Sequence, residues 1–186
     1  MTSNKVKTMI TAAMLSSIGI IIPMYSPFKI IIEPASFTLA SHVAVMIAMF
    51  ISPVVGISVA LVTSFGFLLG PFPPVVVLRA LTHVIFVTLG ALILKKNPNI
   101  LLSLKTMIPF AILISVVHAI AEVFVSSLFY FTGTVTTSYL ISVVGLVGLG
   151  TFIHSLCDFA IAVLVWKPIQ HVISIPANAK IRVKAR

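Results

Sequence analysis

The sequence predicts an all-α integral membrane protein, and three observations predict this fold class. Hydrophobic residues make up 60% of the 186 residues. Charged residues make up only 8%, whereas typical soluble domains contain about 25%. Long apolar runs alternate with short segments rich in Pro, Gly or charge, which is the pattern of membrane-spanning helices. A soluble globular fold is therefore excluded, and we expect one domain over residues 1–186.

The apolar runs define the predicted helices, because a helix needs about 20 mostly apolar residues to cross a bilayer. Six helices are expected, at residues 8–24, 39–52, 54–70, 75–94, 106–130 and 138–166. The second is short, and only Ser52 and Pro53 separate it from the third. Four full spans plus a tilted or partly re-entrant pair is therefore an alternative count. The first helix is expected to stay in the mature protein, since no small-residue cleavage site follows it.

Basic residues predict the orientation, because Lys and Arg are enriched on the cytoplasmic side of membrane helices. Six spans with both termini in the cytoplasm place the basic groups before the first helix, between the fourth and fifth, and after the sixth on the inner side. These groups are Lys5 and Lys7; Lys95, Lys96 and Lys105; and Lys167, Lys180, Arg182, Lys184 and Arg186. The formal net charge of +9 thus reflects topology in a bacterial plasma membrane, and we expect no nucleic-acid partner.

Three segments outside the helices have recognisable character. Residues 25–38 are apolar and broken by Pro27 and Pro34, so we expect an external loop packed over the outer mouth. Residues 70–74 contain three prolines and predict a rigid external turn. The basic tail, residues 171–186, is expected to lie on the cytoplasmic side along anionic lipid headgroups.

Three charged residues lie within apolar runs: Arg79, Glu122 and Asp158. A charge at the bilayer centre costs roughly 2.5 to 3.5 kcal/mol on insertion scales, so such residues usually face a protein interior or an aqueous cavity and carry function. Arg79 has three interpretations. It binds a ligand carboxylate through two hydrogen bonds, it forms a structural ion pair with Glu122, or it reaches the outer headgroups.

The predicted topology brings several polar side chains to one outward-facing pocket. Arg79 lies about one turn below the outer surface, and His83 lies one turn deeper on the same face. Glu122 lies at comparable depth, with His118 at position i−4 on the same stripe. Aromatic walls with a few polar groups are typical of a small-molecule site. The predicted substrate-binding residues are Arg79, His83, Glu122, His42, Phe37 and Tyr139.

A second pair, His154 and Asp158, is predicted to lie in the inner half of the membrane, away from this mouth, and to form a structural hydrogen bond. A metal site built from His118, Glu122, His154 and Asp158 is conceivable. Such spacing is common on helices, however, so we expect no metal and no cofactor in this chain. The chain's one cysteine, Cys157, is expected to be a packing residue.

Catalytic motifs are absent from the sequence. It has no His-Glu-x-x-His zinc motif, no Gly-x-Ser-x-Gly nucleophile elbow and no Gly-x-x-x-x-Gly-Lys-Ser/Thr phosphate loop. We therefore expect no enzyme, and in particular no ATPase. A carrier that works alone, with Glu122 and Asp158 taking up protons during transport, is an alternative function.

The first predicted helix carries small residues four positions apart, Ala12 with Ser16 and Ala13 with Ser17. Such a strip lets another membrane helix approach closely. The approaching helix belongs either to the same chain or to a partner protein.

These features together resemble the substrate-binding S components of energy-coupling factor (ECF) vitamin transporters. The resemblance is carried by the segment Lys7-Thr-Met-Ile-Thr-Ala-Ala-Met-Leu-Ser-Ser17, by Phe50-Ile-Ser-Pro53 and by the basic tail. It implies a protein that binds one vitamin from outside, with the first external loop as a lid. It also implies docking through the first helix, at Ala12, Ala13, Ser16 and Ser17, onto a transmembrane coupling protein that two cytoplasmic ATPases power.

Pantothenate ranks first among the vitamins considered. Its carboxylate suits Arg79, and its hydroxyl and amide groups could donate to Glu122. Nicotinate offers a carboxylate but no donor for Glu122. Pyridoxine and hydroxymethylpyrimidine offer donors for Glu122 but leave Arg79 without a partner.

Overall fold

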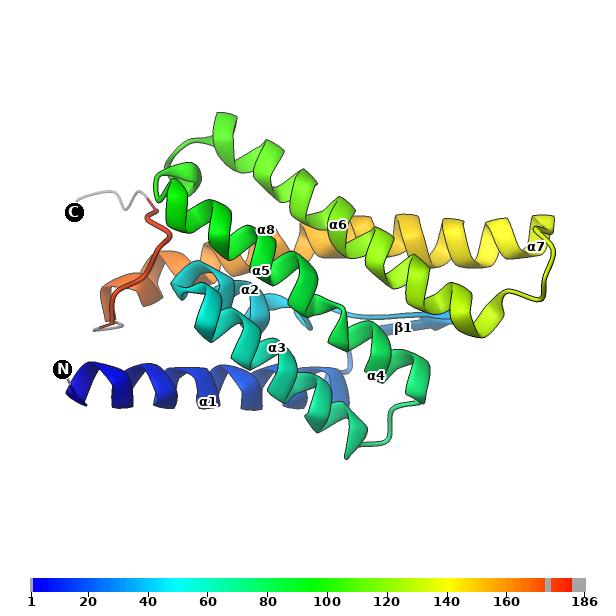
Figure 1. Cartoon of the computed structure of the whole chain (residues 1–186), viewed down its shortest axis with the longest axis horizontal. Coiled ribbons are helices and arrows are strands. Elements are labelled where there is room, and N and C mark those ends of the chain that lie inside the picture. Colours follow the sequence, from blue (N-terminus) through cyan, green and yellow to red (C-terminus); the bar gives the residue numbers. More distant parts are fainter. Residues whose placement is uncertain (1, 173–174, 182–186) are drawn as a thin grey trace.

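The helices of the computed structural model lie side by side in an elongated bundle (Figure 1). The model describes residues 2–172 and 175–181. The first half of the chain contains α1 (Thr2–Tyr25), β1 (Lys29–Ile32), β2 (Ala35–Thr38), α2 (Val43–Ile51), α3 (Pro53–Leu68) and α4 (Pro74–Leu81). The second half contains α5 (His83–Lys96), the short 3-10 helix η1 (Ile100–Leu102), α6 (Leu104–Tyr130), α7 (Thr137–Tyr139), the π-helix η2 (Leu140–Leu149) and α8 (Gly150–Val172).

The predicted apolar runs all correspond to helices, and the all-α membrane class holds for the bundle. Within the described part of the chain, four helical segments are long and apolar enough to cross a membrane: Asn4–Tyr25, Pro74–Lys96, Leu104–Tyr130 and Thr137–Gln170. Helix α3, at 16 residues, is shorter, and α2 has only nine. The short predicted pair at residues 39–70 is thus a short buried helix followed by a longer one.

The break between α2 and α3 falls where the sequence places it. The Ser52 hydroxyl accepts a hydrogen bond from the backbone N–H of Val55 at 3.2 Å, which caps α3. Pro53 occupies the first turn, where its missing N–H leaves no helical hydrogen bond unmade. The two residues end one helix and start the next.

The predicted helix 75–94 differs from the structure, because it divides at Thr82 into α4 and α5. The Thr82 hydroxyl donates to the carbonyl oxygen of Arg79 at 2.7 Å, so it takes up a carbonyl oxygen near the end of α4. This break falls between the two predicted site residues Arg79 and His83.

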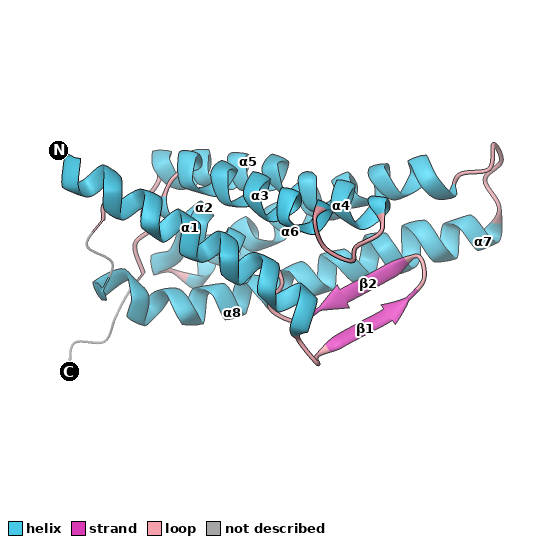
Figure 2. Ribbon diagram, turned by 90° about the horizontal axis from the view of Figure 1, so that it is seen from below, coloured by secondary structure: helices cyan, strands magenta, loops and turns pink. Residues whose placement is uncertain are grey.

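The segment 25–38, which we predicted to be an external loop, contains regular structure. Residues 29–38 form an antiparallel hairpin in which Lys29 pairs with Thr38 and Ile32 pairs with Ala35. The hairpin runs along one side of the bundle, away from the end that holds the N terminus (Figure 2). Only Ala35 and Thr38 are buried among the strand residues, so the backbone hydrogen bonds of the hairpin, rather than burial, give this apolar segment its shape.

The core centres on α2, whose nine residues are all buried. Helices α1, α3, α5 and α8 pack around it. Gly56 on α3 permits a close approach of α3 to α5, since a Cβ atom at this position would lie 2.4 Å from Cγ1 of Val87 on α5. Both Val87 and the neighbouring Met49 on α2 are fully buried, so neither has space to withdraw.

The C-terminal segment differs from the surface tail that we predicted. The backbone N–H groups of Asn178 and Ala179 donate to the carbonyls of Ile51 and Phe50 at the end of α2. The buried indole of Trp166 donates to the Ala179 carbonyl at 3.2 Å. Residues 175–181 therefore close the end of the core instead of lying along the headgroups, because the last carbonyls of α2 need partners. Residues 173–174 and 182–186 lie outside the described part of the chain.

Gly56→Ala is expected to lower stability by about 1 to 3 kcal/mol, because the added methyl group overpacks a core that cannot expand locally. Thermal unfolding of the purified protein in detergent measures the change. Gly145→Ala is the matched control, since the nearest atom to its added Cβ lies at an ordinary 3.6 Å. Equal melting temperatures for the two variants would contradict the close approach of α3 to α5.

Candidate substrate site

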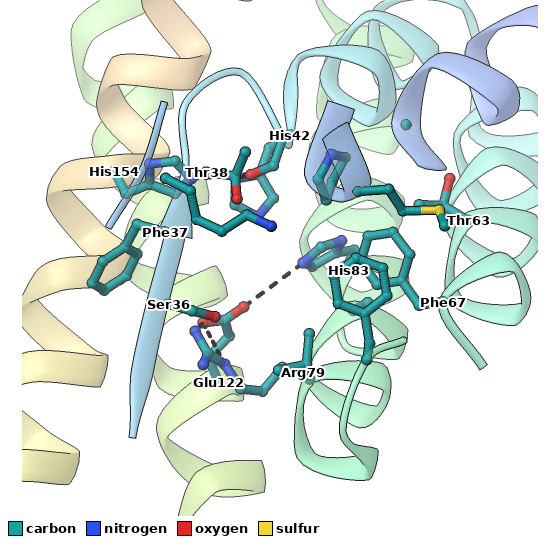
Figure 3. Close-up of a pocket in the computed structure, with 18 of the residues that line it drawn as sticks. Ser36, Phe37, Thr38, His42, Thr63, Phe67, Arg79, His83, Glu122 and His154 are labelled. Atoms are coloured by element: carbon teal, nitrogen blue, oxygen red, sulfur yellow. Dashed lines mark hydrogen bonds and ion pairs between the residues drawn. The ribbon is translucent and has the colours of Figure 1, made fainter. Parts of the chain in front are cut away.

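A cavity of about 290 Å³ opens between the hairpin and helices α1, α3, α4 and α8. Its size is close to the lower limit of about 300 Å³ for small-molecule pockets, which suits a small ligand. Five of the six predicted substrate-binding residues line it: Phe37, His42, Arg79, His83 and Glu122. Figure 3 shows their side chains around the same space.

Tyr139 does not line this cavity. Its hydroxyl lies 2.8 Å from Oγ of Ser127, and its ring packs on Phe131. The reason is that α6 and the helix that starts with α7 extend beyond the cavity, and Tyr139 lies at that far end (Figure 1). The aromatic wall is instead made by Phe37, Phe72 and Phe67, the last two stacked with ring centroids 4.4 Å apart.

Arg79 and Glu122 form a buried ion pair. Nε and Nη2 of Arg79 donate to Oε2 of Glu122 at 3.0 and 2.6 Å. The Thr151 hydroxyl donates to the same oxygen at 2.7 Å. Both charged residues are at most 5% exposed. Nη1 of Arg79 has only a long contact of 3.5 Å to the Pro34 carbonyl, so it is the guanidinium nitrogen with the weakest hydrogen bond to the protein.

The other carboxylate oxygen of Glu122, Oε1, faces histidines. It lies 3.2 Å from Nε2 of His118, one helical turn earlier on α6, as the i−4 spacing predicts. It lies 3.7 Å from Nε2 of His83. Glu122 thus divides its two oxygens between a cation on one side and imidazole rings on the other.

Four imidazole rings gather beneath the cavity, those of His42, His83, His118 and His154, which we call the histidine cluster. The ring of His42 lies 4.7 to 4.9 Å, centroid to centroid, from each of the other three. The cluster includes four of the five histidines in the sequence. They come from separate segments, so the fold rather than a local motif collects them.

Asp158 fixes the position of His42. Its carboxylate accepts hydrogen bonds from the backbone N–H of Ala40 at 2.8 Å and from the backbone N–H of His42 at 2.9 Å. It also accepts from Nδ1 of His42 at 3.0 Å. Ala40 has a φ of 67°, a left-handed conformation that is uncommon for a residue other than glycine. The anchored N–H groups hold the chain in this turn as it enters α2.

The prediction that His154 and Asp158 lie away from the site is wrong. His154 lines the cavity, and Asp158 contacts His42 directly. The reason is the depth of His42. It precedes a nine-residue helix that is buried throughout, so it lies inside the bundle and not at an outer helix end. The hydrogen bonds of Asp158 are made with His42 and Ala40, and Nε2 of His154, the predicted partner, lies 3.4 Å from the Asp158 carboxylate.

Sequence reasoning missed several lining residues, of which Lys29 and Thr151 matter most. Lys29 lies on β1 and adds a second cation to the cavity wall. Its signal was its position, since it departs from the otherwise cytoplasmic pattern of basic residues. Thr151, which bonds Glu122, gave no signal because a single threonine in an apolar run is ordinary.

The small-residue strip on α1 divides into two faces. Ser16 is buried and its hydroxyl donates to the Ala12 carbonyl, and Ala12 packs against the core. Ala13 and Ser17 are exposed. The pair Ala12 and Ser16 therefore packs within its own chain, and Ala13 with Ser17 offers small residues outward.

These observations define the class of the protein: a helical membrane protein with a small cavity lined by aromatic and a few charged side chains, and with exposed small residues on its first helix. Comparison with curated proteins gives a relative over most of the chain. The niacin transporter NiaX of Lactococcus lactis subsp. cremoris (strain MG1363) is 42% identical over 160 residues, which cover 85% of this chain and 72% of the relative. No family model and no solved structure matches the chain.

The chain belongs to the S components of ECF-type vitamin transporters. It is accordingly a multi-pass protein of the cell membrane and a transporter component, not an enzyme.

Arg79→Met is expected to destabilise the protein by about 3 to 5 kcal/mol, because it leaves the buried Glu122 charge without its partner. The double variant Arg79→Met with Glu122→Gln removes both charges and is expected to recover much of this loss. Unfolding in detergent measures each variant, with the exposed Lys95→Met as a control for loss of a positive charge. If the free-energy losses of Arg79→Met alone and of Glu122→Gln alone simply add in the double variant, the two residues are not coupled.

Proposed function

We propose that this chain is the vitamin-binding subunit of an ECF-type uptake transporter and that its substrate is nicotinate. The relative of stated function is a niacin transporter, and nicotinate was among the candidates from the sequence. The pantothenate that we ranked first has no support from that comparison. The observation that carries the proposal is the set of hydrogen bonds around Glu122.

Pantothenate ranked above nicotinate because Glu122 was expected to need donors from the ligand. In the structure Glu122 already accepts from Arg79 and Thr151 and lies within hydrogen-bond distance of His118. A ligand that carries only acceptors therefore leaves no buried carboxylate unsatisfied. The objection to nicotinate disappears, because Glu122 does not need donors from the ligand.

The charges of the cavity favour an anion. Arg79 and Lys29 both line it, whereas Glu122 is the one acidic residue that does so among the described residues. We assign the nicotinate carboxylate to the Nη1 edge of Arg79, assisted by Lys29, and the pyridine ring to the wall made by Phe37, Phe67 and Phe72. His42 and His83 form the floor beneath the ring.

The proposal includes the movement of the hairpin. We infer that residues 25–38 act as a lid, since Lys29 and Phe37 line the cavity from this segment. Phe37 packs against Gly150, where a Cβ atom would lie 2.5 Å from the ring. The hairpin is thus seated against the start of α8 without being part of the bundle core, and its displacement would open the cavity.

We further propose six spans with both termini in the cytoplasm, and docking of the chain on a coupling protein driven by two ATPases. The start of α1 and residues 175–181 lie at one end of the bundle (Figure 1). The cavity and hairpin lie toward the other end, which supports an outward site. The exposed Ala13 and Ser17 make this face of α1 the proposed docking strip.

Binding of labelled nicotinate to the purified chain tests the substrate. Nicotinate is expected to bind and to be displaced by unlabelled nicotinate, while pantothenate, pyridoxine and hydroxymethylpyrimidine do not displace it. Lys29→Met is expected to weaken nicotinate about fivefold, equivalent to about 1 kcal/mol for a partly exposed charge. Lys29→Arg should restore most of the affinity. Displacement by pantothenate instead, at lower concentration than nicotinate, would overturn the assignment.

Transport and binding should separate at the docking strip. Ser17→Trp is expected to abolish uptake by the complete transporter in vesicles while leaving nicotinate binding by the isolated chain unchanged. Ile120→Trp, on the exposed face of α6, is the matched control and should retain uptake. Uptake by the isolated chain, without partner subunits, would contradict the subunit function.

A further inference from the structure

The histidine cluster contains a set of side chains with the composition of a metal site. His42 precedes α2, His83 begins α5, and His118 and Glu122 lie one turn apart on α6. All four are buried, and one potential ligand atom from each lies within 4.8 Å of the other three. In the proposed nicotinate site, His42 and His83 of this cluster form the floor. That proposal gives no role to His118.

The nitrogen atoms of two rings are oriented by neighbouring groups. Nδ1 of His42 lies 3.0 Å from the Asp158 carboxylate, which can only accept, so Nδ1 carries the hydrogen. In the neutral ring, Nε2 then holds the lone pair. Nδ1 of His118 lies 3.3 Å from the Ser155 hydroxyl, which can either donate or accept. In the metal-free protein Nε2 of His118 faces the Glu122 carboxylate and donates to it, so a metal bound at Nε2 requires the hydrogen to move to Nδ1, where the Ser155 hydroxyl accepts it. Metal-bound histidines usually have their second nitrogen held in this way by a carboxylate or another acceptor.

The distances fit a tetrahedral ion. Zinc bonds of about 2.0 to 2.1 Å place neighbouring ligand atoms of a tetrahedron about 3.3 Å apart. Oε1 of Glu122 lies 3.2 Å from Nε2 of His118 and 3.7 Å from Nε2 of His83. Oε1 is also the oxygen that Arg79 and Thr151 leave free, since both bond Oε2. The potential ligand atom of His42 lies within 4.8 Å of the other three, so the four groups must draw closer to one another around a bound ion.

The donor set selects the kind of ion. Three imidazole nitrogens and one carboxylate oxygen suit Zn²⁺, Co²⁺ and Ni²⁺ and are unlike the all-oxygen sites of Mg²⁺ and Ca²⁺. Glu122 and Asp158 carry two negative charges, whereas the ion and Arg79 together carry three positive charges, so one net positive charge remains among these groups. The added positive charge would lie below Arg79 and favour an anion in the cavity above.

We propose that His42, His83, His118 and Glu122 bind one divalent transition-metal ion of the zinc class beneath the substrate cavity. The ion joins the entrance of α2 to α5 and α6 and stabilises the cavity floor. This site replaces the expectation from sequence that the chain binds no metal, which considered a different quartet with His154 and Asp158. It does not rest on the proposed function, because metal binding is measured without any vitamin.

Titration of the full, tag-free chain with Co²⁺ after treatment with a chelator tests the site. One Co²⁺ ion per chain is expected, with the strong visible absorption of tetrahedral cobalt, and Zn²⁺ should displace it. His83→Gln and His118→Gln are each expected to weaken binding at least tenfold. Asp158→Asn, which changes the group that supports His42 and the turn at Ala40, should weaken it about 10- to 100-fold.

His154→Gln is the matched control, because His154 belongs to the same cluster but bonds Ser41 and lies outside the proposed ligand set. It should bind Co²⁺ like the unmodified chain. A rise in melting temperature on adding Zn²⁺, absent in His83→Gln, provides a second readout. Lack of saturable Co²⁺ binding by the unmodified chain, or equal effects of His83→Gln and His154→Gln, would overturn the proposal. Nicotinate binding without metal binding would leave the proposed function intact and refute this site alone.

Discussion

The carboxylate of Glu122 is the constraint on which the site depends. A buried charge is tolerated only when it is paired and its lone pairs are hydrogen-bonded. Glu122 meets this requirement by accepting from Arg79 and Thr151 at one oxygen and facing His118 and His83 with the other. Helices α4, α5, α6 and α8 must therefore meet at one depth. The same arrangement leaves Nη1 of Arg79 with only a long contact to the Pro34 carbonyl, and this is the edge to which we assign the carboxylate of the proposed ligand.

A second constraint acts from the opposite side of the cavity through α2. This short helix is buried along its whole length. Asp158 holds its entrance through the N–H groups of Ala40 and His42, while residues 178 and 179 satisfy the carbonyls at its other end. Because both ends of α2 are fixed, the ring of His42 has a defined place in the cavity wall. The site thus combines rigid helices beneath with a hairpin above.

Local patterns in the sequence predicted much of the fold and part of the site. Apolar runs indicated the helices, the helix directions placed Arg79 level with Glu122, and the i−4 spacing identified His118. Prediction failed where contacts between distant parts of the chain determine the structure. The depth of His42 follows from the burial of α2. Residues 175–181 pack at the end of the core because they bond the last carbonyls of α2. Tyr139 was misplaced because the predicted boundaries did not reveal how far α6 and its successor extend past the cavity. The sequence also did not indicate that groups of the chain itself donate to Glu122. Without them, pantothenate ranked above nicotinate.

The central claim is that the cavity holds a small anionic vitamin on the Nη1 edge of Arg79. Mass spectrometry of the intact protein, purified from cells supplied with a mixture of vitamins, tests it most directly because a tight site retains its ligand through purification. The account predicts one nicotinate per chain, with the bound ligand lost in Arg79→Lys, which keeps the charge but not the two-pronged hydrogen bonding. Copurification of pantothenate or of an uncharged vitamin, retained equally by both proteins, would contradict it.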